Sequence, residues 1–145
     1  MHFEISVDID AAAETVWALL ADVERWPGMT DSIDRVELLD KPFALSSKAR
    51  VHQPRLPAAV WTVTAFDENE TFTWESRSPG VRTVAAHDIA RRPDGTVSVR
   101  LAIDQTGPLA PAASLLAGRL TRRYVTMEAN GLKAEAERRS GTGSP

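Results

Sequence analysis

The stretch IDAAAETVWALLADVERWP, residues 9–27, contains the change of hydrophobic period that decides the fold. In residues 2–9 apolar and polar side chains alternate without a break, which predicts a strand with one buried and one wet face. From Asp10, a residue type that caps helix N-termini, apolar side chains recur three and four residues apart, which predicts a helix to about residue 22. Trp26-Pro27-Gly28 ends it, with room for a second short helical turn over 23–26.

The middle of the chain is typical of antiparallel strands joined by short turns. Turn-forming residues punctuate it, and the strongest turn signal is Pro93-Asp94-Gly95. Between the turns, alternating and β-branched runs predict six strands. These cover residues 35–39, 48–53, 59–66, 71–76, 81–90 and 96–104.

A long helix is predicted to close the chain, from just after Gly107-Pro108 to about Arg139. The apolar side chains that recur at helical spacing, and so mark the expected buried stripe, are Leu109, Ala113, Leu116, Leu120, Tyr124 and Met127. Residues 140–145 are expected to form a disordered tail. With no repeat or linker, residues 1–139 are expected to form one domain.

The order of these elements predicts an α+β fold. A seven-stranded antiparallel sheet must cover one face, and the final helix is the only element long enough to do so. If the sheet curves around that helix, the space between them need not be filled. We therefore expect an internal cavity.

Composition excludes several function classes. The chain of 145 residues has no cysteine, which removes disulfides, thiolate metal sites and cysteine nucleophiles. It has no apolar run long enough to span a membrane and no secretory leader, so no stable membrane insertion and a cytoplasmic location are expected. Its net charge of −3 does not indicate nucleic-acid binding. Residues 1–75 are acidic and 76–145 basic, which indicates either two halves that pair with each other or a basic patch for an anionic partner.

Metal and nucleotide sites also lack support. The three histidines are dispersed and show no metal-ligand spacing, so no metal or cofactor is expected. Glycine-rich phosphate loops and the serine-hydrolase elbow are missing from the sequence.

The opening helix signature resembles that of the START/Bet v 1-like (SRPBCC) superfamily, in particular its polyketide cyclase/dehydrase-like branch. The resemblance covers about residues 3–138. It continues through segments Gln53-Pro54, Val60–Val63, Phe72–Trp74, His87 and Gly107–Leu109. It implies a helix-grip fold whose cavity binds a hydrophobic or aromatic small molecule. The chain departs from related sequences after Trp26-Pro27, where Met29 stands near a position that often carries a second tryptophan, so the pocket entrance is expected to differ.

Four tryptophans carry much of the large apolar surface. Trp61 and Trp74 are expected to point inward, either as flat walls for a cyclic ligand or as core residues. Trp26 is expected at the cavity mouth, and Trp17 in the core.

His87 and Tyr124 are the weak catalytic candidates. His87 shares strand parity with Thr83, Ala85 and Ile89, but both parities are apolar there, so its orientation stays open. A neutral imidazole or a tyrosine hydroxyl could bond a ligand or handle a proton, and either could equally be a satisfied structural group. The full set of expected ligand-binding residues is Trp26, Met29, Trp61, Trp74, His87, Val99, Leu116, Leu120 and Tyr124.

Two functions of the cavity remain open at this point, beside a regulatory or chaperone role in which an arginine cluster on the final helix contacts a partner. The first is binding of a hydrophobic, cyclic or lipid-like small molecule by a monomer or weak homodimer. The second, implied by the resemblance, is aromatase/cyclase-like catalysis that folds a poly-β-ketone in a shaped pocket. The cluster Arg119, Arg122 and Arg123 indicates either a solvated helix face or a contact with an anionic membrane or acidic partner.

Overall fold

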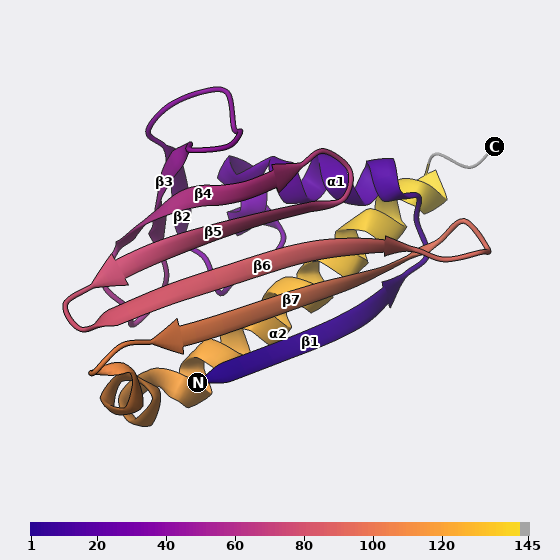
Figure 1. Cartoon of the computed structure of the whole chain (residues 1–145). Helices are drawn as coiled ribbons and strands as arrows, with labels where there is room; N and C mark the ends of the chain where they lie inside the picture. The colour runs from indigo at the N-terminus through magenta and orange to yellow at the C-terminus, as the bar shows by residue number, and fades with distance from the viewer. Residues whose placement is uncertain (143–145) are drawn as a thin grey trace.

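The computed structural model describes residues 1–142 of the chain and shows a curved antiparallel sheet crossed by one long helix (Figure 1). The elements run in the predicted order, and the α+β helix-grip prediction is confirmed. Strand boundaries agree with the sequence prediction to within one or two residues for all seven strands. Their bounds are β1 His2–Ile9, β2 Arg35–Leu38, β3 Lys48–His52, β4 Ala59–Asp67, β5 Thr71–Ser78, β6 Val81–Arg91 and β7 Val97–Thr106.

The sheet is a meander closed at one edge by the first strand. Its order is β1-β7-β6-β5-β4-β3-β2, and every neighbouring pair is antiparallel. The register places Phe72 of β5 opposite His87 of β6, and His87 opposite Leu101 of β7. Because residues in register share a sheet face, His87 points to the same side as these two buried apolar residues. The sequence alone did not decide which face of β6 carries His87. The register places it on the concave face, which is turned toward the helix.

Two helical segments follow β1, as the change of period predicts. The first is α1, Ala13–Ala21, and the second is the 3₁₀ helix η1, Val23–Gly28. The N-cap of α1 is Ala12 and not Asp10, whose backbone N–H instead donates to Glu137 of the final helix. Trp17 on α1 is buried in the core, as expected.

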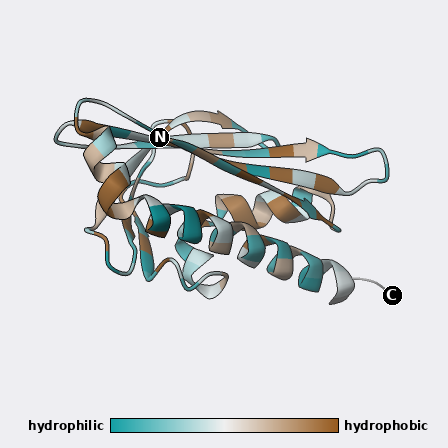
Figure 2. Ribbon diagram, turned by 90° about the horizontal axis from the view of Figure 1, so that it is seen from below, coloured by the Kyte–Doolittle hydropathy of each residue, from teal (hydrophilic) through white to brown (hydrophobic). Residues whose placement is uncertain are grey.

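The final helix α2, Ala110–Thr142, lies across the concave face of the sheet (Figure 2). It extends three residues past the expected end at Arg139 and so takes in the first half of the segment expected to be a disordered tail; residues 143–145 lie outside the described part. Glu135 pairs with Arg138 and Arg139 one turn ahead, which supports these last turns.

The buried face of α2 differs from the predicted stripe. The residues that pack on the sheet and on α1 are Val125, Ala129, Leu132 and Ala136. Leu116, expected in the stripe, is 86% exposed because the first turns of α2 extend past the sheet. The spacing rule was sound, but it selected the wrong face of the first half of the helix.

Ion pairs between the acidic and basic halves support the first explanation of the charge asymmetry. Arg92 pairs with Asp8, Arg91 with Glu14, and Arg100 with Glu4. These pairs bring the C-terminal half of the sheet against the N-terminal strand and helix. The expectation that the two halves pair with each other is therefore met in this part of the surface.

Candidate functional site

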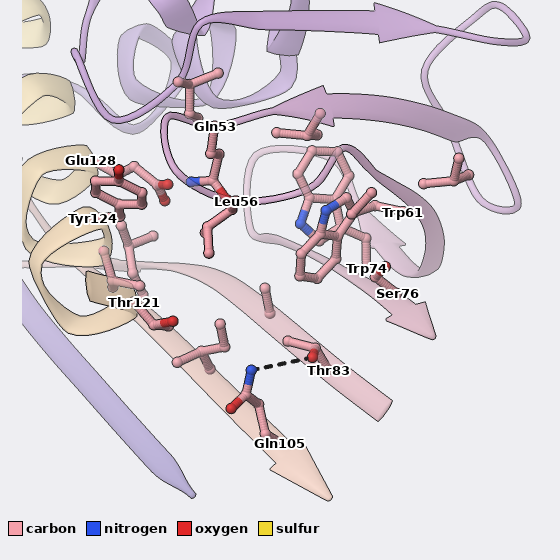
Figure 3. A pocket seen from close by; sticks show the side chains of 18 of the residues that line it. Gln53, Leu56, Trp61, Trp74, Ser76, Thr83, Gln105, Thr121, Tyr124 and Glu128 are labelled. Carbon is pink, nitrogen blue, oxygen red and sulfur yellow. Dashed lines mark hydrogen bonds between the residues drawn. The ribbon is translucent and has the colours of Figure 1, made fainter. Parts of the chain in front are cut away.

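A cavity of about 430 Å³ lies between the concave face of the sheet and α2 (Figure 3). Strands β4 to β7 supply one wall, α2 the other, and the loop from Gln53 to Ala58 closes the side between them. Exposed residues of that loop and of the β5 end, such as Pro57 and Arg77, also border it, so the cavity opens to solvent there. Its volume falls in the range of about 300–1,000 Å³ typical of small-molecule pockets.

Trp61 and Trp74 form an aromatic wall on one side of the cavity. Their ring centroids are 5.6 Å apart, with 32° between the ring planes. Trp74 is buried, with Trp26 packed edge-on against it at 5.3 Å, whereas Trp61 is only half-buried and lies nearer the opening. Neighbouring strands present the two indoles, since β4 and β5 pair and both residues point inward. This surface is flat enough to stack a cyclic ligand.

His87 borders the inner part of the cavity. Its ring stacks on Phe72, with centroids 4.1 Å apart, and its Nδ1 lies 3.1 Å from the backbone oxygen of Phe72. A carbonyl oxygen only accepts, so Nδ1 carries the proton and donates it, which leaves Nε2 as the acceptor. Burial lowers the pKa of His87 to about 4, against the smaller opposing effect of that hydrogen bond. At neutral pH His87 is therefore a neutral hydrogen-bond acceptor facing the cavity.

Glu128 on α2 borders the same cavity and, like His87, a smaller pocket at its inner end. Burial alone raises the pKa of Glu128 to about 8. Among the described residues its carboxyl group has no hydrogen-bond or ion-pair partner. No fully buried side-chain nitrogen or oxygen of these residues lacks a partner, so the carboxyl oxygens of Glu128 keep some accessible surface. The carboxyl group therefore meets the open space of the cavity. At neutral pH it is mostly a neutral acid, with an O–H to donate.

Three other polar side chains near the cavity are already paired. Tyr124 donates its hydroxyl to the backbone oxygen of Pro54 at 2.5 Å, and this bond ties the loop to α2. Gln53 donates to the backbone oxygen of Ser32, and Gln105 to the Thr83 hydroxyl. The carboxyl group of Glu128 and Nε2 of His87 can hydrogen-bond a guest without losing a protein partner, and they are the two ionisable groups of the cavity lining that can do so.

Comparison with known proteins decides the family. The family described as "Polyketide cyclase / dehydrase and lipid transport" has a model that matches residues 1–137 of the chain. The chain belongs to this family. None of the curated protein sequences compared with the chain matches it.

Solved structures similar to this polyketide cyclase/dehydrase-family chain share its fold. The Zhui aromatase/cyclase from Streptomyces sp. R1128 is 19% identical, with a TM-score of 0.82 over 100% of this chain and 99% of that one. A START superfamily protein from Mycobacterium smegmatis is 17% identical, with a TM-score of 0.72 over 92% and 97% of the two chains. The di-domain aromatase/cyclase BexL of the BE-7585A biosynthetic pathway is 17% identical, with a TM-score of 0.74 over 94% of this chain and 46% of that one. At these identities the likeness establishes the fold, and the resemblance to the START/Bet v 1-like superfamily is confirmed.

Five of the predicted ligand-binding residues border the cavity of this family member. They are Trp26, Trp61, Trp74, His87 and Tyr124. Trp26 does not stand at the mouth, however: it is buried at the inner end, where its indole N–H is shared between the backbone oxygens of Leu19 and Leu20. The prediction of a rim position was wrong, because the 3₁₀ turn after α1 folds the ring inward.

The other four lie elsewhere. Met29 borders the small inner pocket and not the entrance, and Val99 is fully buried in the core. Leu120 is half-buried outside the cavity, and Leu116 is exposed to solvent. Both leucines were assigned through the wrong face of α2.

Glu128 is the residue that sequence reasoning missed. It lies four residues after Tyr124 and four before Leu132, both of which are buried on the sheet-facing side. A glutamate flanked in this way at helical spacing was a detectable signal. The sequence analysis considered only apolar and aromatic side chains of this helix as cavity residues and so did not consider Glu128.

The described residues, 1–142, contain neither a group of three or more potential metal ligands nor a helix long and apolar enough to cross a membrane.

Proposed function

We propose that the protein binds a hydrophobic, cyclic small molecule in the internal cavity, with its polar substituents held by Glu128 and His87. The observation that carries this proposal is the placement of two partnerless polar groups in a cavity with an aromatic wall. Burial of an unpaired polar group costs about 1–3 kcal/mol, so such groups inside a cavity are best explained by a partner that arrives with the ligand.

The two groups complement each other chemically. The protonated carboxyl of Glu128 donates to a ketone or ether oxygen, and Nε2 of His87 accepts from a hydroxyl. A ring system stacked on Trp61 and Trp74 would bury its apolar faces meanwhile. A hydroxylated aromatic ketone meets all three requirements, and a plain fatty acyl chain meets only the apolar one.

The sheet and α2 of a single copy enclose the cavity, and we propose that one copy is enough to bind the ligand. This supports a monomer or weak homodimer as the working form. No membrane-spanning helix is found among residues 1–142. We also propose a cytoplasmic location, which suits a chain free of cysteine.

Calorimetric titration with emodin, a trihydroxyanthraquinone, and naringenin, a flavanone, tests the proposal. Ala85→Leu would fill space in the cavity, because Ala85 lines it opposite Trp74. Ala65→Leu is the matched control, since Ala65 is exposed on the paired strand β4 and does not border the cavity. We expect at least one probe to bind wild type and Ala65→Leu with equal affinity and Ala85→Leu at least about tenfold more weakly. No binding of either probe to wild type, or equal binding to all three proteins, would contradict the proposal.

A second function, aromatase/cyclase-like catalysis, is favoured by the chemistry of the same pair. In an aldol cyclisation, a base removes a proton from the carbon between two carbonyls, and that carbon attacks another carbonyl whose oxygen then takes up a proton. Nε2 of His87 could take the first proton, and Glu128 could supply the second. Two of the structurally similar proteins are aromatase/cyclases by their descriptions.

The catalytic proposal has its own test. A poly-β-ketone offered as a thioester is incubated with wild type, His87→Gln and Glu128→Gln, and the products are separated by chromatography. We expect wild type to shift the products toward one cyclised species and each variant to lose about 100-fold of that rate. If emodin binds and the products match those formed without protein, the protein is a binder and not a cyclase.

A further inference from the structure

One exposed face of α2 combines two leucines with three arginines. We call it the Leu-Arg face and define it by Leu115, Leu116, Arg119, Arg122 and Arg123. Arg119 follows Leu115 by four residues, Arg122 follows it by seven, and Arg123 follows Leu116 by seven. These spacings place all five on one side of the helix.

The leucines of this face have no packing role in the chain. Leu115 is 87% exposed and Leu116 is 86% exposed, the highest values among the large exposed apolar side chains of the described residues. Single exposed leucines are ordinary, but two adjacent ones at the tip of a projecting helix form a patch. They lie on the first turns of α2, past the end of the sheet, and no other part of the described chain covers them.

The arginines of the face are equally free of partners. Arg119, Arg122 and Arg123 are exposed, and among the described residues their guanidinium groups make no ion pair or hydrogen bond. By contrast, Arg77, Arg82, Arg91, Arg92 and Arg100 all pair with carboxylates. The chain carries no acidic residue between Asp104 and Glu128, so the positive charge is not offset along this segment.

The Leu-Arg face adjoins the opening of the cavity. Leu109, just before α2, packs on Gly80 of the β5–β6 turn, and its N–H donates to the Gly80 oxygen. Ser78 of the same turn region borders the cavity. On the helix itself, Leu116 precedes the cavity residue Thr121 by five positions, about 7.5 Å along the axis. Figure 1 shows the first turns of α2 at the same end of the molecule as the β5–β6 turn.

We propose that the Leu-Arg face docks on an anionic phospholipid bilayer and so brings the cavity opening to the membrane surface. The leucines would enter the boundary between headgroups and acyl chains, and the arginines would pair with phosphates. The charge complementarity of three unpaired cations selects a negative surface. A bilayer accepts two protruding side chains without a preformed pocket, which favours it over a folded acidic protein. The inference rests in part on the proposed function, because a hydrophobic guest would be exchanged at such a surface.

Vesicle co-sedimentation of the full chain tests the docking. The vesicles are phosphatidylcholine alone, or phosphatidylcholine with about one quarter phosphatidylglycerol. Test variants are Leu115→Ser with Leu116→Ser, and the triple change of Arg119, Arg122 and Arg123 to Gln. Matched controls are Leu45→Ser, an exposed leucine elsewhere, and the triple change of Arg25, Arg35 and Arg91 to Gln, which removes equal charge from distant exposed sites.

We expect wild type and both controls to bind the anionic vesicles and not the neutral ones, with weaker binding as salt is raised. The arginine variant should bind on the order of 100-fold more weakly, and the leucine variant at least about tenfold more weakly. Equal binding to both vesicle types, no binding, or binding unchanged in the two test variants would overturn the proposal. So would a concentration-dependent dimer in sedimentation equilibrium that the leucine variant abolishes, since a second copy would then cover the face.

Emodin titration of the same variants separates this inference from the proposed function. The Leu-Arg variants should keep wild-type emodin affinity, because no residue of the face lines the cavity. Vesicle binding by a wild type that binds neither emodin nor naringenin would contradict the proposed function alone. Emodin binding without vesicle binding would contradict the membrane-docking proposal alone.

Discussion

The imidazole of His87 stacks on the ring of Phe72 at 4.1 Å while its Nδ1–H donates to the backbone oxygen of Phe72. One residue therefore fixes both the orientation and the tautomer of the other. The consequence is a neutral imidazole whose Nε2 is presented to the cavity.

His87 should make the fold sensitive to acid. Its pKa is about 4 in the folded chain and about 6.5 when unfolded, so the unfolded chain binds the extra proton first as pH falls. The contribution of His87 to the free energy of unfolding is fully present above about pH 6.5. It falls by about 3 kcal/mol as the pH is lowered toward 4. Urea denaturation between these pH values should show a shallower loss for His87→Gln than for wild type. His52→Gln, altered outside the cavity, should follow wild type; parallel curves for wild type and His87→Gln would refute the assignment.

Glu128 should act in the opposite direction. Its pKa rises from 4.5 to about 8 on folding, so the folded chain holds the proton that the unfolded chain has already lost. Stability should fall as pH rises from about 4.5 to about 8, by roughly 4–5 kcal/mol, and level off above that.

Glu128→Gln removes this titration while keeping the shape of the side chain. We expect the variant to be more stable than wild type at pH 8 and its free energy of unfolding to vary less between pH 5 and pH 8. Denaturant unfolding at a series of pH values measures both effects. Glu14→Gln on the exposed side of α1 serves as the control. A wild-type slope that persists in Glu128→Gln would show that the carboxyl group is ionised in the fold.

The strand order and the sheet-on-helix architecture could be predicted because they depend on local periodicity. The orientation of His87 could not, since both faces of residues 81–90 carry apolar side chains and only the register with β7 decides between them. The face of α2 depends on where the sheet ends, which is a non-local property. Leu116 and Leu120 continue the apolar spacing of the sequence but lie beyond or beside the cavity.

Glu128 shows a different limit. Patterning assigns charged side chains to solvent, and this is correct for most of them. A buried acid in a cavity is an exception to this rule, and such an exception marks a candidate functional site.

Trp61 and Trp74 should separate binding from stability. Trp74 is 3% exposed and contacts several aromatic rings, so Trp74→Ala should cost about 3–5 kcal/mol of unfolding free energy. Trp61 is half-buried at the cavity wall, so Trp61→Ala should cost roughly 1–2 kcal/mol yet weaken emodin binding at least about tenfold. Urea unfolding and calorimetry measure the two effects. The distinction fails if Trp61→Ala unfolds as easily as Trp74→Ala or binds emodin normally.

Gly131 should be intolerant of any side chain. A Cβ at this position would lie against the backbone oxygen of Met29, so η1 and α2 could no longer approach as closely. Gly131→Ala should therefore destabilise the fold by about 1–3 kcal/mol, although alanine favours helix elsewhere. Gly141→Ala, in the same helix with open space around the added carbon, should be neutral or slightly stabilising. Thermal unfolding compares the two, and a stabilised Gly131→Ala would contradict the close approach.

The four tryptophans allow the most direct test of the proposed ligand site. Each indole N–H gives one signal in a ¹H–¹⁵N spectrum, and titration with emodin reports on all four at once. We expect saturable shifts for Trp61 and Trp74, which face the cavity, and a much smaller change for Trp17, which does not border it. Equal shifts of all four signals, or no saturable shift of Trp61 and Trp74, would contradict the claim that this cavity holds an aromatic ligand.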